Sequence, residues 1–144
     1  MKVLNKISIF LILVLVFGMG LLIDCKSPSD PQQEEQADAN PSFANVIQAI
    51  FTTSCAVSGC HNATAAQGLD LSTGNARGNI VGILSTQDNT KNLVTAGDAI
   101  NSYLVMKIEG RQTAGGRMPL GGSALSTVKI QNIKNWINNG ANDN

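Results

Sequence analysis

Apolar residues recur with helical spacing soon after position 40 of the chain. The first such pattern follows Ser42, a residue type favoured at helix N-caps, and Pro41 just before it fits a helix start. Its apolar positions share one helical face: Phe43, Val46, Ile47, Ile50 and Phe51. The pattern therefore predicts an amphipathic helix that ends near Thr53.

A second apolar face lies further along the chain, at Ile100, Tyr103, Leu104 and Ile108. Asp98 is the candidate N-cap of this helix, and Gly110 supplies a stop signal at its C-terminal end. Between the two patterns, residues 68–71 read as an extended or turn segment. A short helix is expected within residues 74–84.

The last apolar pattern predicts a helix near the end of the chain. Ser126 is its candidate N-cap, and Gly140 is the candidate residue just after its C-cap. Ile130, Ile133 and Ile137 share one face of this helix, with Trp136 beside them. Because no segment alternates over a useful length, the sequence predicts an all-α domain with helices near both ends and long loops between them.

The N-terminal segment has a different pattern. Lys2 and Lys6 precede an almost unbroken apolar run over residues 7–23, which is typical of a secretory signal. The end of that run, Leu22-Ile23-Asp24-Cys25, resembles a bacterial lipoprotein signal, although a small residue is usual where Asp24 stands. The resemblance implies cleavage before Cys25 and lipid attachment to it. The alternative is a retained membrane anchor, since the run has nearly the length that spans a bilayer.

Residues 26–40 contain no large apolar side chain and are expected to form a flexible tether of about 20 Å reach. The sequence thus divides into a signal peptide at 1–24, a tether at 25–40 and a domain at 41–144. A lipidated Cys25 would hold this domain close to a membrane of the cell envelope, facing the periplasm or the cell exterior.

The charge balance narrows the choice of partners. The chain has 10 basic and 10 acidic residues, and only 14% of its residues are charged. Removal of the signal would leave eight basic and nine acidic residues, a net charge of −1. A nucleic-acid-binding protein needs a basic face, so the sequence predicts no nucleic-acid partner.

The main candidate for chemistry is the string Cys55-Ala56-Val57-Ser58-Gly59-Cys60-His61. Two cysteines followed at once by a histidine form the signature of covalent haem attachment, although the common spacing between the cysteines is two residues. Two thiols must reach the two vinyl groups of one haem, and the histidine must follow immediately for its imidazole to reach the iron. Three other readings stay open for this string: a Cys55–Cys60 disulfide, a structural zinc site, or free thiols beside a surface histidine.

A second axial ligand would suit a haem that carries electrons, and methionine sulfur is a common partner of histidine. Two methionines lie in the predicted domain. Met106 falls inside a helical apolar pattern, where a core role is expected, whereas Met118 lies in a Gly-rich loop before Pro119. Met118 is therefore the candidate ligand, and the competing reading is a methionine that covers an apolar patch.

Several short motifs between Ser42 and Ala141, taken in their order along the chain, resemble those of the small c-type cytochromes. They are a helix running into Cys55…Cys60-His61, then Gly68-Leu69-Asp70-Leu71, Ser102-Tyr103-Leu104, Arg117-Met118-Pro119 and Trp136-Ile137. The resemblance implies a cytochrome c-like fold in which the first and last helices cross beside one covalent haem c. It also implies that Cys55 and Cys60 carry the thioethers, that His61 is the proximal ligand and that Met118 is the distal one.

The leading functional hypothesis is a tethered mono-haem electron carrier that meets redox partner proteins through transient contacts and is not an enzyme. One alternative is a five-coordinate haem protein that binds small ligands; His61 is the only histidine, so a peroxidase would lack a distal one. The other alternative is a haem-free lipoprotein with a Cys55–Cys60 disulfide, acting as a binding or scaffold domain of the envelope.

Overall fold

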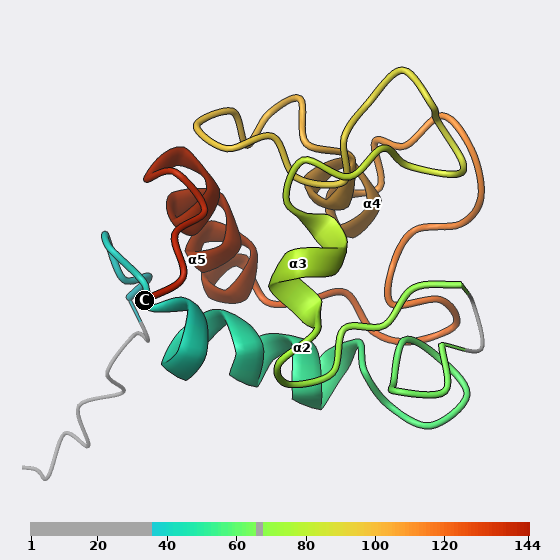
Figure 1. Ribbon diagram of the computed structural model, residues 1–144, viewed down its shortest axis with the longest axis horizontal. Coiled ribbons are helices and arrows are strands. Elements are labelled where there is room, and N and C mark those ends of the chain that lie inside the picture. Colours follow the sequence, from blue (N-terminus) through green and yellow to red (C-terminus); the bar gives the residue numbers. More distant parts are fainter. Residues whose placement is uncertain (1–35, 66–67) are drawn as a thin grey trace, which may run out of the picture. The chain divides into compact units, whose positions relative to one another are not determined.

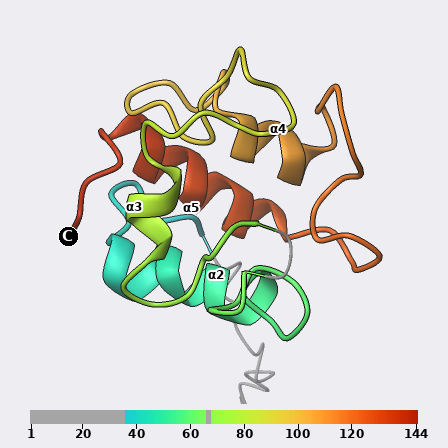
Figure 2. The same cartoon turned by 45° about the vertical axis from the view of Figure 1, so that its right-hand side comes forward.

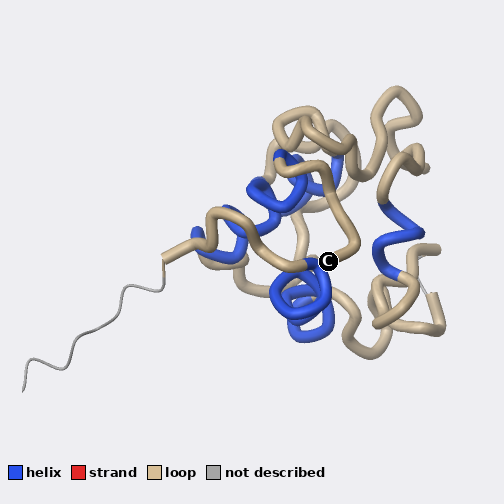
Figure 3. Tube along the Cα trace, turned by 60° about the vertical axis from the view of Figure 1, so that its left-hand side comes forward, coloured by secondary structure: helices blue, strands red, loops and turns tan. Residues whose placement is uncertain are grey.

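The computed structural model describes residues 36–65 and 68–144 of the chain. The predicted signal peptide at 1–24, the lipid site at Cys25 and most of the predicted tether lie outside these residues. The helices in the described part are η1 (Phe43–Ile47), α2 (Gln48–Ser54), α3 (Ala76–Ile80), α4 (Tyr103–Glu109) and α5 (Thr127–Asn138), shown in Figure 1. Extended pairing in these residues is limited to isolated bridges such as Val81 with Val94. Figure 3 shows short helices joined by long loops, as the sequence predicts.

The first predicted helix is present and begins at the expected cap. Ser42 has an extended backbone, and its hydroxyl accepts a hydrogen bond from the main-chain N–H of Asn45 at 3.4 Å. The first turn is a π-turn, in which the N–H of Ile47 reaches the oxygen of Ser42 at 3.2 Å, and α2 continues from it directly. The apolar face predicted from the sequence is the buried face, with Ile47 and Phe51 fully covered.

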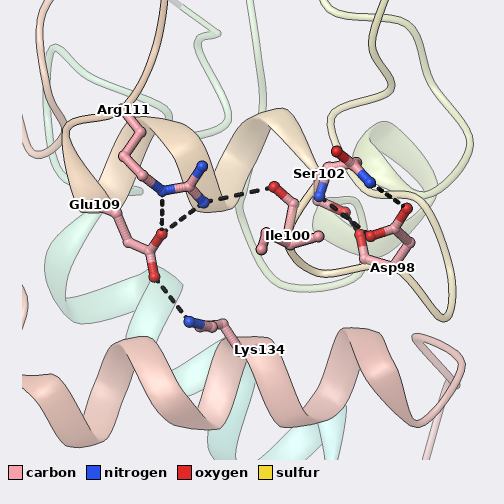
Figure 4. A network of polar contacts seen from close by, with 7 residues as sticks. Asp98, Ile100, Ser102, Glu109, Arg111 and Lys134 are labelled. Atoms are coloured by element: carbon pink, nitrogen blue, oxygen red, sulfur yellow. Dashed lines mark hydrogen bonds and ion pairs between the residues drawn. The ribbon is translucent and has the colours of Figure 1, made fainter.

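The second predicted helix starts later than expected, so the assignment of its N-cap to Asp98 is wrong. The α4 helix begins at Tyr103, and Ser102 is its N-cap. The Asp98 carboxylate instead accepts hydrogen bonds from the main-chain and side-chain N–H groups of Asn101, at 3.2 and 2.7 Å, which close a local turn before the helix (Figure 4). Because this turn lies outside the helix, Ile100 is 65% exposed instead of sharing the buried face.

The last predicted helix is confirmed at both ends. The Ser126 hydroxyl accepts a hydrogen bond from the N–H of Lys129 at 3.3 Å, and Gly140, with a φ of 101°, follows the C-cap of α5. Ile133, Trp136 and Ile137 are its buried side chains.

The first and last helices pack against each other through aromatic side chains. The ring centroids of Phe43 in η1 and Trp136 in α5 lie 5.2 Å apart, and Phe43 also meets Phe51 edge-on at 6.4 Å. The α4 helix packs on another part of α5. Thus α5 lies between the N-terminal helical segment and α4 (Figure 2). This contact of the first and last helices agrees with the expected arrangement, while the cytochrome c-like fold as a whole stays a prediction.

Polar contacts join the two ends of the described chain. The main-chain oxygen of Asn144 accepts hydrogen bonds from the N–H of Ala44 at 3.0 Å and from the Ser42 hydroxyl at 2.6 Å. Arg77 of α3 donates through Nε to the main-chain oxygen of Ala141 at 2.9 Å. These contacts supply partners for the start of the first helix and tie α3 to the C-terminal segment.

Residues 38–40, which the sequence assigns to the tether, are hydrogen bonded to α5 and to the residue after it. Asn132 accepts from the N–H of Asp38 at 2.7 Å, and Asn135 donates to the oxygen of Asp38 at 2.6 Å. Asn139 donates to the oxygen of Ala39 at 2.9 Å. The spacing of the three asparagines places them along one side of the helix. Their hydrogen bonds therefore attach the chain to α5 from Asp38 onward.

Candidate functional site

The cysteine–histidine loop is closed by its own backbone. Cys55 caps the C-terminal end of α2, and its main-chain oxygen accepts a hydrogen bond from the N–H of His61 at 3.1 Å. Within the loop, the N–H of Cys60 donates to the oxygen of Val57 at 3.0 Å. Gly59 has a φ of +77°, a conformation that glycine adopts without strain. The loop therefore returns Cys60 and His61 to the end of the helix on which Cys55 lies.

The imidazole of His61 has a hydrogen-bond partner on one nitrogen. Its Nδ1 lies 3.3 Å from the main-chain oxygen of Leu69, and the main-chain oxygen of His61 accepts from the N–H of Leu71 at 2.7 Å. A carbonyl oxygen can only accept, so Nδ1 is the donor. In a neutral imidazole the lone pair then lies on Nε2, which is the arrangement that metal-ligating histidines use.

The segment that orients His61 is itself held on both sides. Gln48, a buried residue of α2, donates through Nε2 to the main-chain oxygen of Leu71 at 3.1 Å. Asn79 donates to the main-chain oxygen of Asp70 at 3.0 Å. The Asp70 carboxylate accepts from the N–H of Ser72 at 2.8 Å, and the hydrogen bonds from Ser72 are the main cause that lowers the pKa of Asp70. Gln48 could not be predicted as part of the site, because its only signal in the sequence is a polar side chain next to the apolar face of a helix.

The two cysteines are free thiols in different surroundings. Cys55 is half-buried and Cys60 is exposed. The pKa of the Cys55 thiol is raised from 9.0 to about 11, mainly by burial and to a smaller extent by the nearby Cys60, while Lys129 at the start of α5 acts in the opposite direction. Cys55 is therefore a neutral thiol at pH 7, with little of the thiolate character that metal binding or nucleophilic attack requires.

Met118 lies in the loop between α4 and α5. Its side chain is half-buried and packs against the hydrophobic core, as do Cys55 and Leu69. Its N–H donates to the main-chain oxygen of Lys107 in α4 at 2.9 Å. Met106, in contrast, is buried within α4, as its place in an apolar pattern predicts.

The loops that carry these residues come to the same side of the domain. In Figure 1 the green loop after α2 and the orange loop before α5 both lie on the right, and Figure 2 again shows both on that side.

Within residues 36–65 and 68–144, no three His, Cys, Asp or Glu side chains are grouped so that they could hold a metal ion. No helix in the same ranges has the length and apolar character needed to cross a membrane.

Comparison of the chain with family models, with curated proteins and with solved structures gave no significant match. The function proposed below therefore rests on the residues of this chain and on their geometry.

Proposed function

We propose that this chain carries a mono-haem c-type cytochrome domain that transfers single electrons at the cell envelope. Cys55 and Cys60 would carry the two thioethers, His61 would hold the iron through Nε2, and Met118 would supply the second ligand of the iron. The observation that carries the proposal is the contact of His61 Nδ1 with the Leu69 oxygen at 3.3 Å, which leaves Nε2 free to bind a metal.

The state of the cysteines supports covalent attachment. A thioether forms when the S–H of a cysteine adds across a vinyl double bond: the sulfur bonds to one vinyl carbon and the hydrogen to the other. This addition needs reduced thiols and has no leaving group. Both cysteines are free.

The surroundings of these residues suit a large apolar group. Partly buried apolar side chains pack on the core from three segments: Ala56 beside Cys55, Leu69 beside the His61 contact, and Ile130 in α5. Such side chains keep part of their surface uncovered, and an apolar group placed over them would remove more of that surface from water.

When bound, the haem supplies a one-electron ferric/ferrous couple. The residues that would hold the iron have contacts of their own in the protein: the His61 ring is oriented by Leu69, and the main chain of Met118 is hydrogen bonded to Lys107. Ligands that are held in this way would limit the rearrangement that accompanies electron transfer.

The proposal also includes the location and the partners. A lipid on Cys25 attaches the domain to a membrane, and redox partner proteins approach the cysteine–histidine loop through small, transient contacts. Val57, which is 42% exposed between the two cysteines, offers an apolar contact point for such partners.

The experiment that tests the proposal is expression of the full chain with export and a haem-attachment system, followed by a denaturing gel stained for haem. We expect the stain to remain with the chain and to be lost when Cys55 and Cys60 are both replaced by Ser. The matched control is Cys25→Ser, which should keep the stain and lose only the membrane attachment. A colourless chain whose Cys55 and Cys60 react with an alkylating agent only after reduction would instead support the haem-free, disulfide-bonded lipoprotein.

The same preparation separates the electron carrier from a five-coordinate haem protein. A ferrous protein that refuses carbon monoxide has both axial positions filled, as we propose. Rapid carbon monoxide binding would show an open distal position and would contradict the role of Met118.

A further inference from the structure

Lys107 of α4 is buried to an unusual degree for a lysine, with an exposed fraction of 7%. Its Nζ donates to Gln87 Oε1 at 2.8 Å and to the main-chain oxygen of Ala114 at 3.4 Å, and it lies 5.9 Å from the centroid of the Tyr103 ring. Neither ion pair found among the described residues includes Lys107. Burial lowers the pKa of this ammonium, so its position has a cost that other interactions must offset.

Those interactions converge on the loop that carries Met118. Lys107 Nζ and the Tyr103 hydroxyl both donate to the main-chain oxygen of Ala114, the hydroxyl at 3.0 Å. The main-chain oxygen of Lys107 accepts the N–H of Met118 at 2.9 Å. A single residue of α4 thus contacts the loop at two points four residues apart, one through its side chain and one through its backbone.

The backbone of this loop comes close to the Lys107 ammonium at Gly115. At Gly115, which has a φ of +67°, a Cβ atom would lie 2.9 Å from Lys107 Nζ and 3.0 Å from Gln87 Oε1. The positive φ favours glycine here, and a Cβ atom would also have to displace the ends of the Lys107 and Gln87 side chains. The segment that contains Gln87 also contacts the loop directly, since Thr113 donates to the Asp88 carboxylate at 3.4 Å.

From these contacts we infer that Lys107 is a positioning residue for Met118: its buried ammonium fixes the loop at Ala114 so that Met118 is held where it can bind the iron. This inference rests on the proposed function, because it assigns Met118 the role of axial ligand. A loop rich in glycine loses much conformational entropy when it is ordered. Without the fixed point at Ala114, Met118 would occupy the binding position for a smaller fraction of the time, and its apparent affinity for the iron would fall by that fraction.

The first test measures how firmly the main chain of Met118 is held, through the rate of hydrogen exchange at its amide in the full chain. Lys107→Met keeps the aliphatic stem and removes the ammonium, and we expect the Met118 amide to exchange about tenfold faster or more. Gln87→Ala removes one partner of the ammonium at an exposed position, so it serves as a second variant if Lys107→Met does not fold. Lys91→Met, a lysine replacement in the neighbouring segment, should leave the exchange unchanged. Unchanged exchange in both Lys107→Met and Gln87→Ala would overturn the inference.

The second test measures the consequence for the haem-loaded protein. We expect Lys107→Met to bind added imidazole at the ferric iron several-fold more tightly than the parent chain and to have a lower reduction potential. Faster exchange of the Met118 amide with unchanged imidazole binding and potential would mean that Lys107 serves only the stability of the loop, which would also overturn the inference.

The results that would overturn the role of Lys107 differ from those that would overturn the cytochrome proposal. A chain that takes up no haem contradicts the cytochrome proposal, and with it the role of Met118, whatever the exchange data show. A haem-loaded chain in which Met118→Ala alters the potential but Lys107→Met does not supports the cytochrome and contradicts only the positioning role.

Discussion

The imidazole of His61 is oriented by the backbone of Leu69: its Nδ1 lies 3.3 Å from the Leu69 main-chain oxygen. The N–H of Leu71 returns a second hydrogen bond to the main-chain oxygen of His61 at 2.7 Å. Two contacts between the same segments fix both the position of the residue and the direction of its ring. The other ring nitrogen, Nε2, has no hydrogen-bond partner within residues 36–65 and 68–144, and it belongs to a ring that the Leu69 contact orients.

If Met118 is the second axial ligand, Met118→Ala should lower the reduction potential of the haem-loaded protein, because a thioether ligand favours the ferrous state. It should also allow imidazole or carbon monoxide to bind the iron. The measurements are a potentiometric titration and the optical spectrum with each added ligand. Met106→Leu is the matched control: it replaces the buried methionine of α4, should cost less than about 1.5 kcal/mol of stability and should leave the potential unchanged. A Met118→Ala protein with the parent spectrum and potential would rule out Met118 as the ligand.

The reactivity of Cys55 in the reduced, haem-free chain should follow its raised pKa. With a pKa of about 11, the thiolate is a minor form at pH 8, roughly one part in a thousand, and its share grows about tenfold with each pH unit up to that pKa. Alkylation rates at Cys55, measured by peptide mass spectrometry over a range of pH, should therefore keep rising well above the ordinary thiol pKa of 9.0. A rate at Cys55 that levels off near pH 9 would contradict the burial of this thiol.

The ends of the helices could be predicted from the sequence because their signals are local. Ser42 and Ser126 act within three residues, and Gly110 and Gly140 end α4 and α5 through their own backbone conformation. Asp98 carries the same kind of local signal, but its carboxylate bonds to Asn101 in a turn that precedes the helix. A cap and an isolated turn use the same residue types, so the sequence alone does not separate them.

Long-range polar contacts could not be predicted, because a backbone acceptor has no signature in the sequence. The contact of Ser42 with Asn144 and that of Arg77 with Ala141 join residues far apart in the chain. The same is true at the candidate site. The adjacency of Cys60 and His61 is visible in the sequence, whereas the Leu69 oxygen that orients the imidazole is visible only in the fold.

Removal of one asparagine contact should loosen the segment before the first helix. Asn135 donates to the main-chain oxygen of Asp38 at 2.6 Å, so Asn135→Ala should lower the free energy of unfolding by about 0.5–1.5 kcal/mol. Urea denaturation of the chain measures the change. Asn89→Ala, at an exposed loop position, should have little effect. Equal stability of the two variants would mean that the contact at Asp38 adds nothing to the fold.

The Glu109 carboxylate joins the end of α4 to α5 and should make stability depend on pH. It lies 2.6 Å from Arg111 and 3.0 Å from Lys134 (Figure 4). Burial raises its pKa, but the hydrogen bonds from Lys134 and Arg111 outweigh this effect and lower the pKa below the ordinary 4.5. Its contribution is therefore present above pH 4.5 and is lost as the pH falls through the lowered value.

Glu109→Gln should accordingly reduce the stability at pH 7 by less than about 1 kcal/mol, since both partners remain partly exposed. The difference from the parent chain should shrink in acid. Urea denaturation at several pH values checks this, and a double-mutant cycle with Lys134→Met isolates the pair. A difference between Glu109→Gln and the parent that stays constant from neutral to strongly acidic pH would contradict the lowered pKa.

The mass of the intact, denatured chain tests the central claim most directly. After expression with export and a haem-attachment system, the chain should carry the mass of one haem that survives denaturation, and alkylation should find no reactive thiol at Cys55 or Cys60. A chain without added haem, in which both cysteines are alkylated either directly or after reduction, would contradict the cytochrome proposal.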